Sequence, residues 1–194
     1  MIKNIIFDIG GVLFDDKNNN LKEKFNLSEE RTKEITNITF GNNFSECMLG
    51  KISVSEYLED MKKRYPDIKE ELEYLLDSKD YPETFPLKKD VYDIVVNLYK
   101  KGYNLYILSN NTKDSFSYVS SNMDMNIFKG IVSSYQEHLI KPDEAIYNLI
   151  VDRYNLKKEE TIFFDDNSKN VLKGNELGIK SIKFNSIEDI INNI

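Results

Sequence analysis

Several residue types are scarce in this sequence of 194 residues, and each scarcity excludes a class of site. Cys47 is the only cysteine, so no disulfide can form within the chain and no cysteine cluster can bind a metal. His138 is the only histidine, which is too few for a zinc site built from imidazoles. Any metal must therefore be held by oxygen ligands, which favours magnesium or a similar hard cation.

Long apolar runs and clustered basic residues are also missing. No segment approaches the roughly 18 uninterrupted apolar residues that a membrane-spanning helix requires. The apolar run near the amino terminus is too short for a signal peptide, so we expect a cytoplasmic protein with no membrane partner. The formal net charge is -7 and the basic residues are dispersed, so we do not expect nucleic acid as a partner either.

What is present is the composition of an ordinary globular protein. Hydrophobic residues make up 40% of the chain and charged residues 30%. The length is large for one minimal domain and small for two full ones. We therefore expect one core domain with a modest insertion.

Short apolar segments alternate with amphipathic ones over most of the chain. Strands are predicted at residues 3–8, 103–111, 129–135, 161–166 and 180–184. Helices are predicted at residues 87–102, 145–155, 170–178 and 187–194. This alternation favours right-handed crossovers and an α/β fold with a doubly wound, mainly parallel, Rossmann-like sheet.

Residues 17–80 differ in character from the rest. Charged residues dominate there, and the apolar residues recur at helical intervals. Ser53 or Ser55 can cap one helix at its start, and Pro66 marks where that helix ends. We therefore predict a small all-α insertion at 17–80, within a core domain formed by residues 1–16 and 81–194.

Polar residues stand at the carboxyl ends of three predicted strands. They are Asp8 after the first strand, Ser109 and Asn110 at the end of the second, and Asp165 and Asp166 at the end of the fourth. The carboxyl ends of parallel strands meet at one edge of a sheet, so these side chains can converge there together with Lys141 from a nearby loop. Taken singly, each has a structural explanation, since such residues are also typical of turns and helix caps.

The chemistry of this set points to a metal and a phosphate. Carboxylates packed together repel one another unless a cation neutralises them, and a divalent metal resolves that conflict. With a metal in place, a hydroxyl, an amide and a lysine suit an anion with several oxygens, for which phosphate is the clearest candidate. A carboxylate can also attack phosphorus to form an acyl phosphate, so Asp8 is a candidate nucleophile.

Four motifs carry a resemblance to a known family. In chain order they are "FDIGGVL", "LSNN", "KPD" and "FFDDNSKNVLKGNELGI". At these distances they resemble the four motifs of the haloacid dehalogenase (HAD) superfamily over residues 2–184, and the insertion falls where that family places its type 1 cap. Within the family, the chain most resembles the branch typified by the bacterial alpha-glucose-1-phosphate phosphatase and by the N-terminal phosphatase domain of soluble epoxide hydrolase.

The resemblance implies a role for each matching residue. Asp8 would be the catalytic nucleophile and a magnesium ligand, and the backbone carbonyl of Gly10 would also face the metal. Ser109 and Asn110 would bind the transferring phosphoryl group of the substrate. Lys141 would act in catalysis by neutralising that group and steadying Asp8.

The last motif offers two acids for the metal. In the family, the main metal-binding acid is followed four residues later by another polar residue, and Asp166 and Asn170 fit that spacing. Asp166 is therefore the expected direct ligand, and Asp165 is the second acid. Together with Asp8, these residues imply Mg²⁺ as the cofactor.

Two positions depart from the family pattern. Gly10 stands where most phosphatases of the family have an aspartate that protonates the leaving oxygen, although the glucose-1-phosphate phosphatase branch has the same glycine. The proton donor is therefore unassigned, and Asp15 is either a substitute or a surface turn residue. His138 stands where relatives have glycine, and we expect a turn there because histidine tolerates a positive φ better than most residues.

The sequence thus predicts a magnesium-dependent phosphatase that hydrolyses a small phosphorylated metabolite, with a sugar phosphate favoured, through a phosphoaspartate intermediate. The cap would close over the site and select the substrate. Two alternatives stay open. A 2-haloacid dehalogenase would turn the same aspartate against carbon without a metal, and a phosphate-binding or interaction module would have lost turnover with the general acid. Neither the identity of the substrate nor the oligomeric state is predicted.

Overall fold

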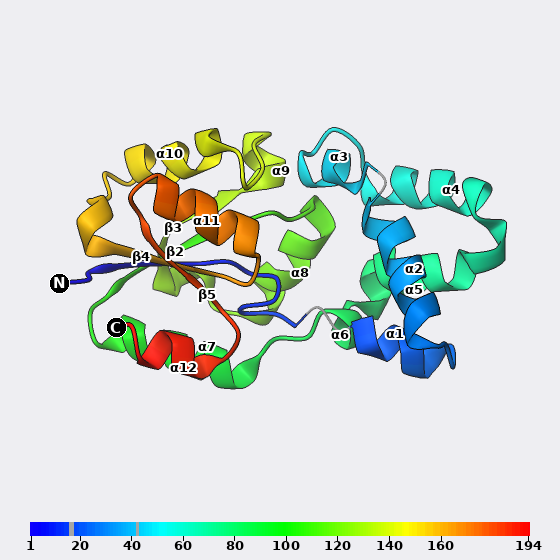
Figure 1. The fold of residues 1–194 in the computed structure, drawn as a ribbon, viewed down its shortest axis with the longest axis horizontal. Helices are drawn as coiled ribbons and strands as arrows, with labels where there is room; N and C mark the ends of the chain where they lie inside the picture. Colours follow the sequence, from blue (N-terminus) through cyan, green and yellow to red (C-terminus); the bar gives the residue numbers. More distant parts are fainter. Residues whose placement is uncertain (16–17, 42) are drawn as a thin grey trace.

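A sheet of five parallel strands lies at the centre of the computed structural model, which describes residues 1–15, 18–41 and 43–194 (Figure 1). The strands are β1 (Asn4–Phe7), β2 (Asn104–Ser109), β3 (Phe128–Ser133), β4 (Thr161–Asp165) and β5 (Lys180–Lys183). Their order across the sheet is β3-β2-β1-β4-β5, and each neighbouring pair is parallel. The doubly wound α/β fold predicted from the sequence is confirmed.

The helices belong to two groups. Those around the sheet are α7 (Lys89–Lys100), α8 (Lys113–Asn122), α9 (Ser134–Glu137), α10 (Glu144–Arg153), α11 (Ser168–Glu176) and α12 (Ile187–Ile191). Those between β1 and α7 are α1 (Asn18–Lys24), α2 (Glu29–Gly41), α3 (Phe44–Met48), α4 (Val54–Arg64), α5 (Lys69–Leu76) and α6 (Tyr81–Thr84). Single turns of 3-10 helix are η1 (Pro66–Ile68), η2 (Ser78–Asp80), η3 (Met125–Ile127) and η4 (Lys158–Glu160).

Both faces of the sheet are buried. Successive residues of a strand point to opposite faces, and in β1 both sets are packed against helices. In β1, Ile5 and Phe7 pack with Val95 of α7 and Ile190 of α12. Ile6 packs into a second cluster with buried residues of α10. Figure 1 shows α7 and α12 along one side of the sheet and α10 and α11 along the other. Burial on both faces explains why β1 is apolar at consecutive positions.

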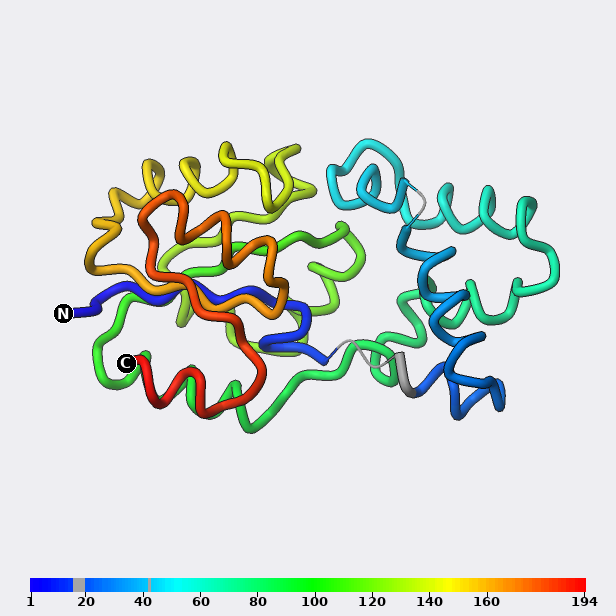
Figure 2. Tube along the Cα trace, in the orientation of Figure 1, coloured from blue at the N-terminus to red at the C-terminus, as the bar shows by residue number. Residues whose placement is uncertain are grey.

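The helices α1 to α6 form what we call the helical layer, which has its own hydrophobic core. Leu21, Met61 and Leu72 are each fully buried in that core. Of the two predicted caps, Ser53 is the one that caps α4, in a reciprocal capping box with Glu56. Figure 2 shows that this layer lies beyond the end of the sheet that is opposite the amino terminus, where the strands reach their carboxyl ends.

The division into a core domain and an inserted cap stays a prediction at the level of its boundaries. The first boundary falls between residues 16 and 17, which lie outside the described residues. The second falls at the start of α6, the helix of the helical layer that also contacts a helix beside the sheet. It packs against α1 and α5 of the helical layer, while Tyr81 stacks edge-to-face on Tyr118 of α8, with ring centroids 5.5 Å apart.

The structure differs from the sequence prediction at the end of β3. The strand stops at Ser133 instead of residue 135, and a short helix, α9, follows at once. The Ser134 hydroxyl accepts a hydrogen bond from the backbone N–H of Asn111, so the side chain binds a main-chain group of the neighbouring segment just where the ladder stops. His138 ends α9 with a φ of 55°, which confirms the predicted turn. No helix among the described residues combines the length and apolar character needed to cross a membrane.

Candidate active site

Asp8 lies at the carboxyl end of β1. The strand order reverses at β1, because β2 and β3 lie on one side of it and β4 and β5 on the other. Its N–H donates to the carbonyl of Phe164 at 2.9 Å, which extends the pairing with β4 by one residue. Its carboxylate accepts a hydrogen bond of 2.7 Å from the N–H of Ile9. The residue is only 7% exposed. This point of reversal is where open α/β sheets bind ligands, so the fold places one carboxylate in that crevice.

Lys141 brings a buried cation against two of the predicted acids. Its Nζ lies 3.0 Å from Oδ1 of Asp8 and 2.6 Å from Oδ2 of Asp165, and it also donates to the carbonyl of Leu108 at 2.9 Å. Burial opposes the charge of the ammonium, but the two carboxylates outweigh that effect and raise the pKa of Lys141 above its ordinary value. The lysine therefore stays charged between the two acids.

The Asp8 carboxyl is strongly affected by its position. Its pKa is raised to about 7, chiefly by burial and in part by the charge of Asp165, against the attraction of Lys141. Ser109, at the end of β2, lowers it by directing its hydroxyl toward the carboxylate. The Ser109 hydroxyl is itself buried and has no partner at normal hydrogen-bond geometry among the described residues. It is an available donor at the mouth of the crevice.

The two acids at the end of β4 have different surroundings. Asp165 is fully buried, and its oxygens accept hydrogen bonds from the side-chain amide of Asn170 at 3.1 Å and from the N–H of Asn167 at 2.8 Å. Asp166 is exposed. The structure pairs Asn170 with Asp165, five residues before it, and the choice of Asp166 as the direct metal ligand stays a prediction. Asp165 is the buried acid of the two because it is the last residue of β4, whereas Asp166 follows the strand.

Three carboxylates form a set that can hold a metal ion. Asp8, Asp165 and Asp166 each present one oxygen, and these oxygens lie within 4.8 Å of one another. Gly11 makes this approach possible, since its φ is +69° and a Cβ there would lie 2.4 Å from the carboxyl carbon of Asp166. The oxygens of Asp165 are already bound by Lys141 and by amide groups. Both contacts given above for the Asp8 carboxylate fall on its Oδ1, so the Oδ2 of Asp8 and the exposed carboxylate of Asp166 have capacity left for a cation.

Asn110 is held differently from the sequence prediction of a phosphoryl ligand. Its side-chain amide donates to the carbonyl of Lys141 at 2.9 Å, and its side-chain oxygen accepts from the N–H of the same residue at 2.8 Å. These two bonds fix the backbone that carries Lys141. A positioning role is therefore visible, whereas the contact of Asn110 with a phosphoryl group stays a prediction.

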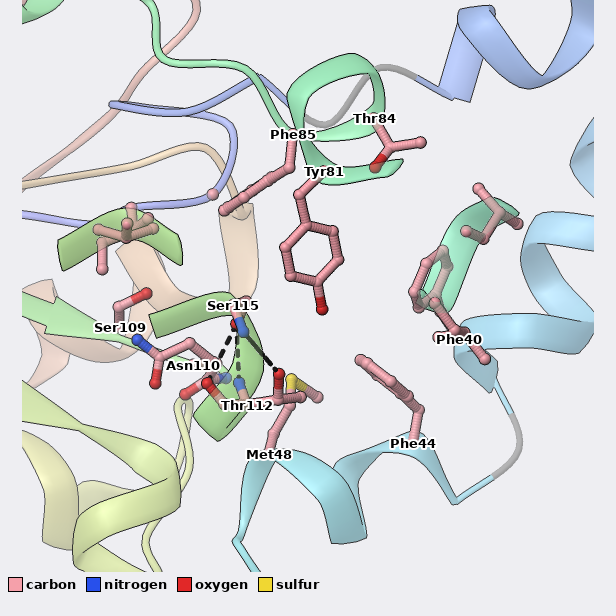
Figure 3. A pocket seen from close by; sticks show the side chains of 16 residues that line it. Phe40, Phe44, Met48, Tyr81, Thr84, Phe85, Ser109, Asn110, Thr112 and Ser115 are labelled. Carbon is pink, nitrogen blue, oxygen red and sulfur yellow. Dashed lines mark hydrogen bonds between the residues drawn. The ribbon is translucent and has the colours of Figure 1, made fainter. Parts of the chain in front are cut away.

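Two further features were not predicted. Lys88, just before α7, donates from Nζ to the carbonyl of Gly11 at 2.8 Å and lies over the ring of Phe184. A lysine in a connecting segment gives no sequence signal for such a contact. The second feature is a cavity of about 370 Å³ between the sheet edge and the helical layer, which Gly10 and Ser109 help to line (Figure 3).

Asp15, Tyr57 and Tyr74 do not line that cavity. The N–H of Asp15 donates to the carbonyl of Pro86 at 2.9 Å, which joins the two chain segments below the helical layer. Tyr57 and Tyr74 are buried in the helical layer, where the Tyr57 hydroxyl donates to the carbonyl of Thr39. Neither Asp15 nor these tyrosines are among the described residues that line the cavity.

A buried acid lies at the switch point of a parallel sheet, paired with a lysine and close to two more acids, in the crevice where open α/β sheets bind ligands. The family described as "Haloacid dehalogenase-like hydrolase" matches residues 5–184. The chain therefore belongs to the haloacid dehalogenase-like hydrolase family, as its motifs predicted.

Individual relatives agree with this assignment. A D-ribitol-5-phosphate phosphatase from Bacteroides thetaiotaomicron is 29% identical over 196 residues, which cover 94% of this chain and 92% of that protein. Bifunctional epoxide hydrolase 2 from Mus musculus is 26% identical over 102 residues, which cover 50% of this chain and 18% of that protein. A polyol-phosphate phosphatase and an epoxide hydrolase are thus both among the similar proteins.

Solved structures show the same fold. A HAD family enzyme from Bacteroides thetaiotaomicron, in complex with magnesium and inorganic phosphate, superposes with a TM-score of 0.73 at 21% identity and 97% coverage of both chains. The L-2-haloacid dehalogenase from Xanthobacter autotrophicus has a TM-score of 0.66 at 18% identity, covering 100% of this chain and 84% of that one. At these identities the likeness concerns the fold.

Proposed function

We propose that this protein is a magnesium-dependent phosphatase that hydrolyses a phosphate monoester of a small metabolite through a phosphoaspartate on Asp8. The observation that carries the proposal is the contact of Lys141 Nζ with Asp8 Oδ1 at 3.0 Å, beside the available hydroxyl of Ser109. An acid held next to a fixed cation and a hydroxyl donor is suited to accept a phosphoryl group, because the charge on its oxygens meets positive charge and hydrogen bonds.

The donor set also fits a hard divalent cation. Asp8 and Asp166 would hold Mg²⁺, together with the backbone carbonyl of Gly10 that the family resemblance implies, while Asp165 would secure Lys141. Bound there, the ion would polarise the phosphoryl oxygens and offset the mutual repulsion of the carboxylates. The magnesium and phosphate complex of the related Bacteroides enzyme agrees with this choice.

The chain's own residues account for both steps of the reaction. In the first, a carboxylate oxygen of Asp8 forms a bond to phosphorus, the bond from phosphorus to the alcohol oxygen breaks, and the electron pair leaves with that oxygen. Lys141 and Ser109 meet the charge on the phosphoryl group. In the second, a water oxygen bonds phosphorus, the bond to Asp8 breaks, and the proton of the water leaves with inorganic phosphate or to solvent.

Sugar and polyol phosphates are the first esters to assay. The motif resemblance favours a sugar phosphate, and a relative over nearly the whole chain is named for a polyol phosphate. Dehalogenation is the less favoured chemistry, because an attack on carbon needs no metal and would leave the grouping of Asp8, Asp165 and Asp166 without a purpose. A binding module without turnover would bind phosphate at the same residues but would cleave no phosphate ester.

The proposal is tested by phosphate release from a panel of phosphorylated sugars, polyols, nucleotides and small acids, with Mg²⁺ and with a chelator. We expect turnover that requires Mg²⁺ and falls at least about a thousandfold in Asp8→Asn. Asp93→Asn, on the exposed face of α7, is the matched control and retains activity. Activity in Asp8→Asn, turnover without metal, or halide release from a 2-halo acid would each show the proposal to be wrong.

A further inference from the structure

The described residues that line the cavity beside Ser109 include four aromatic side chains, those of Phe40, Phe44, Tyr81 and Phe85. Phe40 and Phe44 of the helical layer pack edge-to-face, with ring centroids 5.1 Å apart. Figure 3 shows these two rings across the cavity from Tyr81, whose ring points into it. Met48, from α3, adds a further apolar side chain. A molecule whose phosphate sits beside Ser109 would place its carbon skeleton among these side chains.

The polar side chains of the cavity are mostly engaged with the protein. No charged side chain lines it among the described residues. The hydroxyls of Thr112 and Ser115 bond each other and close the capping box of α8. Thr84 donates to a carbonyl one turn earlier, and Asn110 holds the backbone of Lys141.

The side-chain amide of Asn111 and the hydroxyl of Ser109 are the buried lining donors without a partner at normal hydrogen-bond geometry among the described residues. A sugar or polyol with several hydroxyls would still lose more hydrogen bonds to water than it could regain here, which disfavours its binding.

Among the described residues that line the cavity, none carries a carboxyl group that could protonate the leaving oxygen. Gly10 stands where most relatives have that acid, and Tyr81 is the titratable side chain among the described lining residues. Burial raises the pKa of Tyr81 to about 12, so it is a poor acid at neutral pH. An alcohol that leaves without a proton must be stable as an anion, and a phenol, with a pKa of about 10, meets that condition far better than an aliphatic alcohol.

Resting on the proposed phosphatase activity, we propose that the preferred substrate is an aryl phosphate, the phosphate monoester of an uncharged aromatic alcohol. The ring would lie between Phe44 and Tyr81, with the phosphate at Asp8. The bond from phosphorus to the aryl oxygen would break as the Asp8 oxygen bonds phosphorus. The electron pair would leave on the aryl oxygen as a phenolate, which takes its proton from water after release.

The first test compares kcat/KM, with Mg²⁺ present, across four compounds of different leaving group. 2-Naphthyl phosphate is aromatic, hexyl phosphate is apolar with a poor leaving group, and ribitol 5-phosphate is a polyol ester. Acetyl phosphate is a small reference that needs neither the cavity nor an acid. We expect 2-naphthyl phosphate to exceed both hexyl phosphate and ribitol 5-phosphate by at least about tenfold.

A second test uses the cavity wall itself. Phe44→Ala is expected to lower kcat/KM for 2-naphthyl phosphate by about tenfold and to leave acetyl phosphate unchanged. The matched control is Phe25→Ala, which removes the same ring from the packing of the helical layer against Tyr74, away from the cavity. In that variant both substrates should change by the same factor.

The outcomes separate this inference from the function on which it rests. A higher kcat/KM for ribitol 5-phosphate than for 2-naphthyl phosphate would overturn the substrate class and leave the phosphatase intact. An equal effect of Phe44→Ala on both substrates would do the same. If acetyl phosphate and every ester stay uncleaved in the presence of Mg²⁺, the proposed function itself is wrong.

Discussion

His138 of the α/β core donates a hydrogen bond from Nδ1 to the carbonyl of Leu49, the residue that ends α3, at 2.7 Å. Beside it, the Ser134 hydroxyl donates to the carbonyl of Met48 at 2.6 Å. Two side chains of one core turn thus hold the carboxyl end of a helix in the helical layer. This contact is far in sequence from the segments through which the chain passes between the layers, so it is an independent attachment.

Removing that attachment should weaken substrate binding without changing the chemical step. Glycine adopts the φ of 55° found at His138 without strain, so His138→Gly deletes the side chain alone. We expect KM to rise about two- to tenfold with kcat unchanged, as suits the loss of one hydrogen bond. Amide exchange in residues 44–48 should also become faster. His138→Asn, which keeps a donor and tolerates this backbone, is the control, and an unchanged KM in the glycine variant would contradict the idea.

Lys141 is predicted to contribute to folding and to catalysis in ways that can be separated. Lys141→Met leaves Asp8 and Asp165 buried without their cation, so we expect the free energy of unfolding to fall by about 3–5 kcal/mol. In the double variant Lys141→Met with Asp165→Asn, one of the unpaired charges is removed and much of the stability should return. Phosphatase activity should stay lost in both. Denaturant titration and phosphate release are the two measurements.

Recovery of activity in that double variant would show that Lys141 acts only by balancing Asp165. Asp165→Asn alone is the internal control, since it leaves Lys141 paired with Asp8. It should lose less stability than Lys141→Met.

Gly11 provides a test of the carboxylate geometry. Gly11→Ala adds a Cβ 2.4 Å from the carboxyl carbon of Asp166 and places alanine at a φ of +69°, so it should both destabilise the fold and displace that acid. Gly102→Ala, at a φ of +88° with open space around the new Cβ, carries the backbone cost of about 1–2 kcal/mol alone. We expect lower Mg²⁺ affinity in the first variant only. Equal Mg²⁺ affinities in the two would show that Asp166 is not a ligand.

The α/β core was predictable because its sequence signals are local. Buried strands such as β1 read as continuous apolar runs, and the polar residues that end them must converge once the strands are parallel. Asp8 and Asp165 meet for that reason. What spacing could not decide was which of Asp165 and Asp166 receives Asn170, since this depends on where β4 ends and the side chains diverge.

The cavity could not be predicted from the same signals. Phe40 and Phe44 are four residues apart, a spacing that is typical of an apolar helix face. Core residues such as Ile35 and Met61 belong to apolar faces of the same kind. The pattern therefore does not show which part of an apolar face is left uncovered by other helices. That depends on how the helical layer docks on the sheet. A contact such as His138 to Leu49 joins residues 89 apart in sequence and leaves no periodic trace.

Cys47 offers a pH-dependent test of that docking. Burial and the nearby acids raise the pKa of its thiol to about 11, and the residue is 2% exposed. Because the thiolate is the reactive form, alkylation at pH 8 should be slow and should quicken about tenfold per pH unit as pH rises toward 11. In denaturant the reaction should be fast at pH 8. Rapid alkylation of the native protein at pH 8, followed by mass spectrometry, would show that α3 is not packed as described.

Gly10 is the position where adding a group should change the reaction most. Gly10→Asp restores a carboxyl where most relatives have their acid, and the backbone carbonyl is retained. General acid catalysis helps most when the leaving group is poor, so we expect kcat/KM for hexyl phosphate to rise about tenfold or more while 2-naphthyl phosphate changes little. The rate with hexyl phosphate should then decline at alkaline pH, because the new acid loses its proton. Gly10→Asn, of equal size but without an acidic proton, is the control. A rise that is the same for both esters, or the same in Gly10→Asn, would show that proton donation does not limit the native enzyme.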